Sequence, residues 1–385
     1  MRTSPPPDPP DPPAPPTSPT PAAQRSRRGH GRITLQQVAE AAGITKITVS
    51  RFLRQPDRVA ADTAQRISRA LAATGYVPNK QAGMLASGRS GMVAAIVPSV
   101  ANSVFAETVQ GLSEGLQPAG YELMLASSGY SLQREQAQVR AVLGWSPDAL
   151  AVTGRHHSAE TLAMLRAAVR GGKPVIELWD CEPHGAEFLQ IGFEHAAVGR
   201  AMAQHLVAGG YQRLAYVDTG VDADFRAHER GKAFTTAAHA ALRARHGGRP
   251  APVVTLTAPI GDAFDAGRAA LRQLLGGGLL AVDAVAFAND HLACGALLEA
   301  GRLGLAVPGQ LALLGFGDFA LTRQLGTGVS TVQPPRYEIG TECARTMLRL
   351  LGQPPHARRL TGVAPTAVAW QLVQRGSTAP VDGRT

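Results

Sequence analysis

The lysines and arginines of this chain have the clearest chemical potential, because many of them are gathered in one segment. Residues 24–90 hold 12 of the 38 basic residues against three acidic ones, and the rest of the chain is nearly neutral. So basic a segment favours binding to the phosphate backbone of nucleic acid, because each neutralised phosphate releases condensed counterions. A solvated charged surface without a partner is the alternative.

Patterns for catalysis or metal binding are weak by comparison. His156 and His157 are adjacent but have no supporting carboxylates in the sequence around them, so they do not predict a metal site. Cys181, Cys294 and Cys343 are far apart and predict neither a disulfide framework nor a zinc site. No G-x-S-x-G, Walker or G-x-G-x-x-G sequence opens a helical stretch. We therefore expect neither an enzyme nor a cofactor.

The sequence also predicts where the protein acts. The unpaired cysteines fit a reducing cytoplasm, and no apolar run approaches the roughly 18 residues that a membrane span requires. Residues 1–31 contain 11 of the 28 prolines and few apolar side chains, which predicts a disordered tail. The alternative is that this tail results from an upstream start-site artefact. We assign no function to the tail.

Three short helical patterns lie within the basic segment. Thr34 is a suitable N-cap for a first helix with an apolar stripe, and Gly43 ends it. Thr45 can cap a second helix after a very short turn, and a third helix ends at Gly75. Two helices joined by so tight a turn indicate a helix-turn-helix, in which the second helix reads DNA.

Beyond residue 91 the pattern changes to apolar strands that alternate with helical stretches. Near-continuous apolar strands indicate parallel sheets covered by helices on both faces, which is an α/β architecture. Two series of strands fit two similar lobes better than one wide sheet, and the loops after the strands would point into a shared ligand cleft. The expected strands are 92–97, 121–127, 148–153, 174–179, 213–218, 253–257, 284–289 and 311–316.

Longer runs of the sequence are similar to a known family. TLQQVAEAAGITKITVSRFLR, GYVPNKQAGMLASGRS, GLSEGLQPAGYELMLA, AFANDHLACGAL and LALLGFGD resemble the lactose-repressor (LacI) family. TKITVSRFLRQPDRV, GYELMLASSGY and VIELWD resemble its gluconate-operon repressor branch. The resemblance implies a three-helix headpiece, a hinge helix and a two-lobed domain like that of periplasmic binding proteins. The expected divisions are a disordered tail (1–31), the DNA-binding domain (32–77), the hinge helix (78–90), the effector-binding and dimerisation domain (91–375) and a second tail (376–385).

The resemblance places base-reading positions on the second helix of the headpiece. Lys46 and Ile47 occupy the two leading positions, and Arg51 is the arginine that approaches a base or phosphate. An arginine fork suits guanine O6 and N7, and Ile47 suits a thymine methyl group. The alternatives are an Ile47 buried in the headpiece and an Arg51 that is merely solvated. The expected headpiece contacts are Thr34, Thr45, Lys46, Ile47, Thr48, Ser50 and Arg51.

Residues 78–90 resemble the family's hinge, which folds when two protomers meet over the operator. Leu85 matches the leucine that wedges into the minor groove and kinks the DNA. Gly83 lowers helix propensity by about 1 kcal/mol relative to alanine, which suits a hinge that is poorly helical when free. A plain flexible linker is the alternative. Ala82 would face the same residue of the second protomer. The expected hinge residues are Asn79, Lys80, Ala82 and Leu85.

The resemblance also predicts an effector cleft, with departures from the common pattern. His228 stands where many relatives have arginine. Trp179 stands where many sugar-binding relatives have aspartate, which moves the acid to Asp180; Gly317 similarly moves an acid to Asp318. The expected effector contacts are Ser99, Asn102, Phe105, Trp179, Asp180, Arg226, His228, Arg230, Asn289, Asp290 and Asp318.

Together these observations predict a homodimeric cytoplasmic repressor that binds double-stranded operator DNA and is released by gluconate or a related sugar acid. Arg226, His228 and Arg230 would supply positive charge for a carboxylate. Because positions 179 and 317 carry no acid, a carboxylate ligand would also meet less like-charge repulsion. The alternatives are that these cations form a solvated helix face, and that the effector is a neutral or phosphorylated sugar. An exported sugar-binding protein would need a signal peptide and lack residues 34–88. A two-lobed sugar-modifying enzyme is the remaining alternative.

Overall fold

The computed structural model describes residues 33–78, 88–100, 104–182, 186–249, 252–276 and 282–379. The chain divides into two compact units, Met1–Lys80 and Gln81–Thr385. The predicted tail of residues 1–31 lies outside the described residues. So do the hinge residues Asn79, Lys80, Ala82 and Leu85, and the predicted effector contact Asn102.

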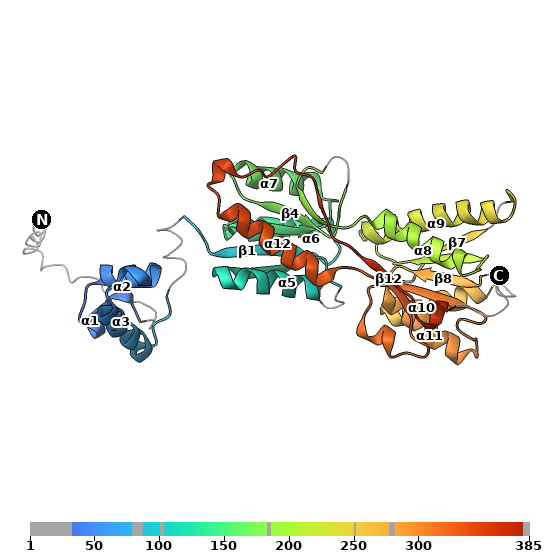
Figure 1. Cartoon of the computed structure of the whole chain (residues 1–385), viewed down its shortest axis with the longest axis horizontal. Coiled ribbons are helices and arrows are strands. Elements are labelled where there is room, and N and C mark those ends of the chain that lie inside the picture. The colour runs from blue at the N-terminus through green and yellow to red at the C-terminus, as the bar shows by residue number, and fades with distance from the viewer. Residues whose placement is uncertain are drawn as a thin grey trace, which may run out of the picture. The chain divides into compact units, whose positions relative to one another are not determined.

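The first unit is a three-helix headpiece (blue in Figure 1), as the sequence predicts. Thr34 and Gln37 form a reciprocal capping box before the first helix, and Gly43 ends that helix with a φ of 64°. Thr45 caps the second helix. Val38, Val49 and other apolar side chains of all three helices form a small core. The elements are α1 (Leu35–Ala42), α2 (Lys46–Arg54), a 3₁₀ turn η1 (Pro56–Arg58) and α3 (Ala61–Thr74).

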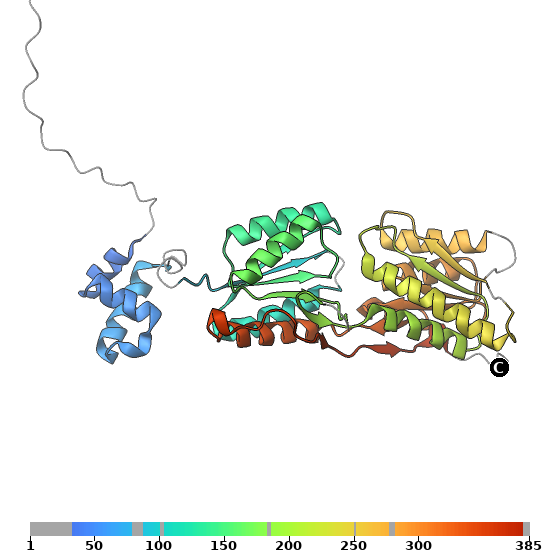
Figure 2. The same ribbon diagram turned by 90° about the horizontal axis from the view of Figure 1, so that it is seen from above.

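The second unit has two lobes, each built on a sheet with six described strands. The first lobe's sheet is parallel throughout, in the order β11-β5-β4-β3-β1-β2. Helices cover both faces of this sheet (Figure 2), with α5 packed on α12 and α6 on α7. Its elements are β1 (Met92–Val97), α5 (Ala106–Leu116), η2 (Gln117–Ala119), β2 (Glu122–Ser127), α6 (Leu132–Gly144), β3 (Ala149–Thr153), α7 (Ala159–Arg170), β4 (Val175–Leu178), β5 (Leu189–Gly192), α12 (Arg336–Leu351), η4 (Pro355–Ala357) and β11 (Thr366–Ala367).

The second lobe repeats the design, in the order β12-β10-β9-β8-β6-β7, with only β12 antiparallel to its neighbour. In this lobe α8 packs on α9, and α10 packs on α11. Its elements are α8 (His195–Ala208), β6 (Leu214–Asp218), α9 (Phe225–Arg245), β7 (Val253–Thr257), α10 (Ala263–Leu275), β8 (Ala284–Phe287), α11 (Asp290–Arg302), β9 (Ala312–Phe316), η3 (Ala320–Arg323), β10 (Ser330–Gln333), β12 (Gln371–Val373) and η5 (Gly376–Thr378).

All eight predicted strands are present, but β5, β10, β11 and β12 were not predicted. The prediction that a tail starts at residue 376 is wrong. Ser377 and Thr378 are buried in the second lobe, and the Ser377 hydroxyl donates a hydrogen bond of 2.6 Å to the Leu313 carbonyl of β9. The packed domain therefore continues to Ala379.

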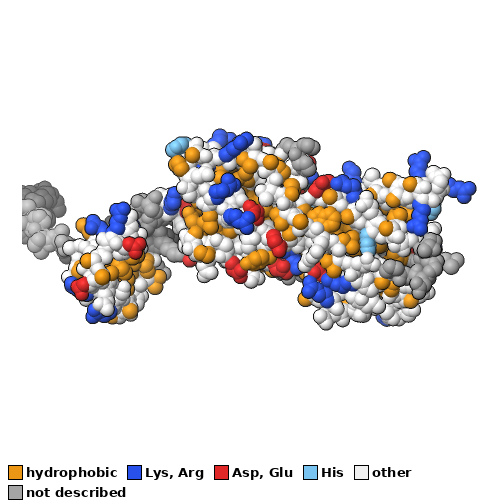
Figure 3. Space-filling view, viewed as in Figure 1, with side chains coloured by type: hydrophobic (Ala, Val, Ile, Leu, Met, Phe, Trp, Pro, Cys, Tyr) orange, Lys and Arg blue, Asp and Glu red, His pale blue; other side chains and the backbone are white. Residues whose placement is uncertain are grey.

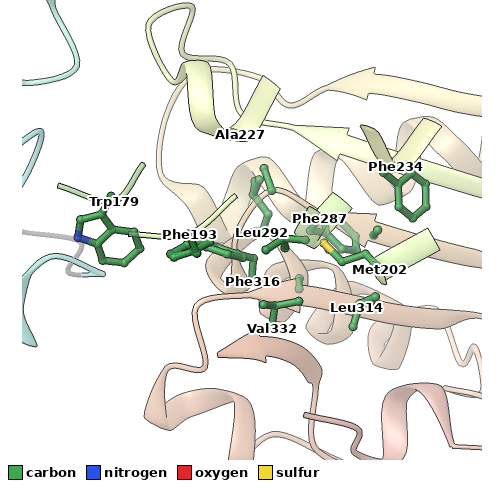
Figure 4. Packing of buried hydrophobic residues seen from close by; sticks show 14 of the residues in the cluster. Trp179, Phe193, Met202, Ala227, Phe234, Phe287, Leu292, Leu314, Phe316 and Val332 are labelled. Carbon is green, nitrogen blue, oxygen red and sulfur yellow. The ribbon is translucent and has the colours of Figure 1, made fainter. Parts of the chain in front are cut away.

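One apolar cluster runs from the first lobe into the second. Trp179 lies at the end of β4, and its ring is 5.8 Å from that of Phe193, which in turn is 6.3 Å from Phe316 of β9. Figure 4 shows these three rings in a row, leading into the core of the second lobe. In the described part, the chain crosses between the lobes around residues 193–194, 334–335 and 368–370. The lobes are therefore linked by both chain and core.

None of the described helices combines the length and the apolar character needed to cross a membrane.

Candidate recognition helix and effector cavity

The second helix of the headpiece, α2, presents polar and basic side chains to solvent. Ile47 is 71 % exposed, which removes the alternative that it is buried in the headpiece. Lys46 and Arg51 are also exposed, and their side chains make no hydrogen bond or ion pair to another described residue. Figure 3 shows basic side chains on the surface of this unit. An exposed apolar side chain between free cations suits a helix that enters the major groove.

The hydroxyl-bearing residues near α2 also make hydrogen bonds within the headpiece. Thr45 Oγ1 accepts a hydrogen bond from the Thr48 amide at 3.3 Å and lies 2.9 Å from the Thr48 hydroxyl. Ser50 is partly buried, and its carbonyl accepts from Arg54. Thr34 accepts from the Gln37 amide as a helix cap. These contacts position α1 and α2, and they leave the DNA contacts of these four predicted residues as predictions.

The turn between α1 and α2 is held by a residue that the sequence did not single out. Arg66 of α3 donates to the carbonyls of Ala42 and Gly43, at 2.7 and 3.1 Å. These carbonyls lie at the C-terminal end of α1, where the helix supplies no N–H donors for them. Arg66 therefore fixes the angle between the two helices from the third.

A cavity of about 220 Å³ lies between the two lobes of the second unit. It sits beyond the carboxyl ends of the strands, where open α/β sheets bind ligands. Six of the predicted effector contacts line it, and they come from both lobes: Ser99, Phe105, Trp179, Arg226, Arg230 and Asn289. Other polar or aromatic residues that line it were not predicted: Tyr130, His195, Thr219, Asp224, His291, Phe316 and Phe319.

Arg230 is almost fully buried in the cavity wall and is already well paired. It donates to His195 Nδ1 at 3.0 Å and to the Ala288 carbonyl at 2.9 Å, and it lies 3.8 Å above the Phe316 ring. Because His195 Nδ1 accepts, Nε2 carries the proton and donates to the Trp179 carbonyl at 2.8 Å. Burial, and then the charge of Arg230, hold the pKa of His195 well below its usual value. This histidine is therefore neutral and links the lobes.

Arg226 lies four residues before Arg230 and is in a different state. Its guanidinium is 5.8 Å from the centre of the Phe105 ring. It makes no hydrogen bond or ion pair to any other described residue, although it lines the cavity. A guanidinium with its five donors free is suited to a planar anion such as a carboxylate.

Four predicted effector residues do not line this cavity. His228 faces Asp218 instead, with Nε2 3.6 Å from Oδ2. Asp290 is buried behind the wall, where it accepts from the Thr331 hydroxyl at 2.6 Å and the Phe319 amide at 3.0 Å. Burial raises its pKa to about 6.

The other two are Asp318 and Asp180. Asp318 is paired with Arg323, at 2.7 Å, and with Arg375. Burial opposes ionisation of Asp318, but these two arginines outweigh it and lower its pKa. Asp180 lines a separate, smaller cavity, and burial raises its pKa to about 6.

The loop after β3 joins the lobes at one side of the cavity. Arg155 pairs with Glu229 of the second lobe at 3.1 Å, and the His156 ring stacks on Phe225 with centres 4.6 Å apart. His157 contacts two carboxylates whose proximity could not be seen from the sequence. Its Nδ1 is 2.7 Å from Glu135 and its Nε2 is 3.4 Å from Glu177.

This cluster is an ion triad. Burial lowers the pKa of His157, but its hydrogen bonding and attraction to Glu135 and Glu177 outweigh burial and raise that pKa to about 9. Among the described residues, no group of three or more histidine, cysteine or acidic side chains is arranged to hold a metal ion. The weak metal signal of the adjacent histidines therefore has a structural explanation.

A helix-turn-helix unit followed by a two-lobed unit with a central cavity defines a class: DNA-binding regulators that carry a small-molecule domain. Residues 34–79 match the model for bacterial regulatory proteins of the lacI family, and residues 203–378 match a periplasmic binding protein-like domain. The chain belongs to the lacI family, and it is a transcriptional regulator, as the members it matches are, and not an enzyme.

Two curated relatives carry the name HTH-type transcriptional regulator GntR. The protein from Pseudomonas aeruginosa is 36 % identical over 327 residues, which cover 85 % of this chain and 92 % of that one. The protein from Escherichia coli K12 is 33 % identical over 323 residues, covering 84 % and 93 %.

A solved LacI-family regulator from Silicibacter pomeroyi is 30 % identical and superposes with a TM-score of 0.78, covering 90 % of this chain and 99 % of that one. The solved GntR regulator from Chromobacterium violaceum is 29 % identical, with a TM-score of 0.64 over 74 % of this chain and 99 % of that one.

Proposed function

We propose that this regulator is a homodimeric repressor of sugar-acid catabolism genes, and that gluconate or a close sugar acid releases it from its operator. The observation that carries the proposal is Arg226, a guanidinium without a described partner in the wall of the cavity between the lobes. Arg226 is partly buried and attracts the Asp180 carboxylate only from beyond ion-pair distance, so an anion bound directly to its guanidinium would stabilise the site.

The rest of the wall supports an acid that also carries hydroxyl groups. Asn289 uses its side-chain oxygen to cap α11, which leaves its amide nitrogen as a donor. Thr219 has a buried hydroxyl with no hydrogen-bond partner among the described residues. Asp224 caps α9 through Oδ1, and its carboxylate can accept from ligand hydroxyls. A ligand with a carboxylate at one end and hydroxyl groups along its carbon chain would satisfy the hydrogen bonding of these side chains.

The relatives agree with this proposal. Both curated relatives described above are named GntR, and the chain itself resembles the gluconate-operon repressor branch. With a DNA-binding headpiece, the protein would act in the cytoplasm, where the chromosome lies.

On the DNA side, Lys46, Ile47 and Arg51 of α2 would read bases in the major groove, once in each half-site. A twofold dimer requires a pseudopalindromic operator. Leu85 would open a flexible pyrimidine–purine step at its centre. Footprinting that showed a single asymmetric half-site would contradict the dimer.

Calorimetry and gel shifts with one ligand series test the effector. The series comprises gluconate, a ketogluconate, 6-phosphogluconate and neutral hexoses, and the DNA is the region upstream of the protein's own gene and of neighbouring sugar genes. We expect gluconate or the ketogluconate to bind and to release the shifted complex. Binding of the neutral hexoses alone would overturn the sugar-acid assignment, and preference for 6-phosphogluconate would assign a phosphorylated effector instead.

A further inference from the structure

A second cavity of about 30 Å³ adjoins the large one. It is lined mainly by first-lobe residues that follow strand ends, such as Ser128 and Asp180, and by Phe225 of the second lobe. Tyr130 and Arg226 line both cavities. These two side chains are therefore the wall that the cavities share.

Tyr130 is fixed in this wall by its backbone. Its φ is 55°, a left-handed backbone conformation that residues other than glycine rarely adopt. It follows Gly129, whose φ is 60°. The next residue, Ser131, is the N-cap of α6, so the helix fixes the backbone directly after Tyr130. The ring also packs against the main apolar cluster. Strained residues of this kind persist where the surrounding structure holds them, and they are common at ligand sites.

Arg226 completes the wall from the other lobe. A Cβ atom at Gly154 would lie only 2.5 Å from Arg226 Nη1 and 3.5 Å from Asp180 Oδ2. Gly154 thus leaves the space that the guanidinium occupies, beside Asp180. Since Arg226 also lies over Phe105 in the large cavity, its side chain reaches from one cavity to the other.

The space behind the wall is suited to hydroxyl groups. Asp180 accepts no hydrogen bond from another described residue: Arg155 Nε and the neutral His195 are both 3.9 Å from Oδ1, and Arg226 acts on the carboxylate only through its charge. Its carboxylate therefore has free lone pairs. Arg155 lines the same cavity; its two terminal nitrogens pair with Glu182 and Glu229, which leaves its Nε, 3.9 Å from Asp180 Oδ1, as a donor.

We propose that Tyr130 and Arg226 form a partition that limits the length of the effector chain, and that the space behind it is a subsite for further hydroxyl-bearing carbons once Tyr130 is removed. The inference rests on the proposed function, in which the large cavity binds an open-chain sugar acid. It adds Tyr130 as the residue that determines effector length.

Calorimetry on the full-length protein tests the partition with two pairs of probes. Gluconate and glucoheptonate are acids of six and seven carbons, and sorbitol and a seven-carbon heptitol are their neutral counterparts. We expect the wild-type protein to prefer gluconate over glucoheptonate by at least tenfold. Tyr130→Gly suits the positive φ and should reduce that preference to less than threefold.

Tyr130→Phe is the matched control, because it keeps the ring in the wall and should keep the wild-type preference. Thermal unfolding and operator binding check that each variant folds, and Tyr130→Ala serves as a second opening variant. If gluconate binds and both opening variants keep the wild-type preference, the partition is overturned.

The neutral pair separates this inference from the proposed function. If only the polyols bind, the sugar-acid assignment fails, and the partition is judged by the same ratio for sorbitol and the heptitol. If none of the four probes binds the wild-type protein, both the assignment and the partition are overturned.

Discussion

Two arginines on one face of α9, Arg226 and Arg230, show how the same side chain takes different roles in one cavity. Arg230 is held by His195, the Ala288 carbonyl and the Phe316 ring, so it builds the wall. Arg226 has its donors free. The sequence identifies both as cations near a cleft, but it cannot show which one is already paired.

Replacing these arginines should therefore have opposite effects on binding and stability. Arg226→Ala should weaken gluconate binding at least tenfold, about 1.4 kcal/mol, and leave the thermal midpoint nearly unchanged. Arg230→Ala should destabilise the protein by about 2–4 kcal/mol, because it leaves buried groups unpaired. Calorimetry and urea unfolding separate the two effects. Equal loss of gluconate affinity without loss of stability in Arg230→Ala would contradict the division of roles.

His157 predicts a pH dependence of stability. Its pKa is raised from about 6.5 in the unfolded chain to about 9 in the folded protein by Glu135 and Glu177. The protonated form is thus favoured by folding, so the stabilisation is complete below pH 6.5 and is lost as the pH rises through 9. The contribution is on the order of 3 kcal/mol.

The measurement is urea unfolding between pH 6 and pH 10, with His157→Gln as the control. The wild-type protein should lose more stability over this range than the variant, and the two should converge at the alkaline end. Parallel curves would show that His157 is not the group that titrates.

At the scale of elements, the helices and strands that carry long apolar patterns were predictable, and those whose buried positions are polar were not. Strand β5 contains Gln190, whose amide donates to Glu177 at 2.6 Å and whose oxygen accepts from the Glu182 amide. Strand β10 begins with the buried residues Ser330 and Thr331. Their hydrogen-bond partners are distant in the sequence, so no local pattern shows that such residues lie in a sheet.

The candidate site was predictable to the same extent. Asn289 and Asp290 both follow β8, and the sequence cannot tell which one faces the ligand. The structure places Asn289 in the cavity wall and turns Asp290 toward Thr331, 41 residues away in the chain. His157 is similar, because it lies in the loop after β3 and Glu135 reaches it from helix α6. Strand ends locate a cleft, whereas long-range pairing decides its contacts.

The recognition helix provides a prediction at this scale. Arg51→Ala should weaken specific operator binding by about 1–3 kcal/mol and relax the preference at one base pair, because an arginine fork reads one guanine. Effector binding should persist, since Arg51 belongs to the headpiece unit and the cavity to the other. Gel shifts against single-base operator variants measure both effects, and retained operator affinity would remove Arg51 from the reading set.

At the scale of the whole molecule, the cavity is divided between two lobes that are joined by chain crossings and by side-chain pairs. Arg155 and Glu229 pair across one side, and Glu107 of α5 pairs with Arg336 of α12, whose guanidinium also donates to the Gly317 carbonyl. A ligand that contacts both lobes can favour one arrangement of these contacts over another, and it shifts the equilibrium by the difference in its affinities.

This coupling has a thermodynamic consequence that can be measured. If gluconate lowers operator affinity by some factor, the operator must lower gluconate affinity by the same factor, because the two binding free energies are linked. Calorimetry with gluconate, on the protein alone and on the protein saturated with an operator duplex, gives one factor, and operator titrations with and without gluconate give the other. We expect both to be tenfold or more, about 1.4 kcal/mol. Equal gluconate affinity with and without operator would mean that gluconate binds without releasing the protein from DNA.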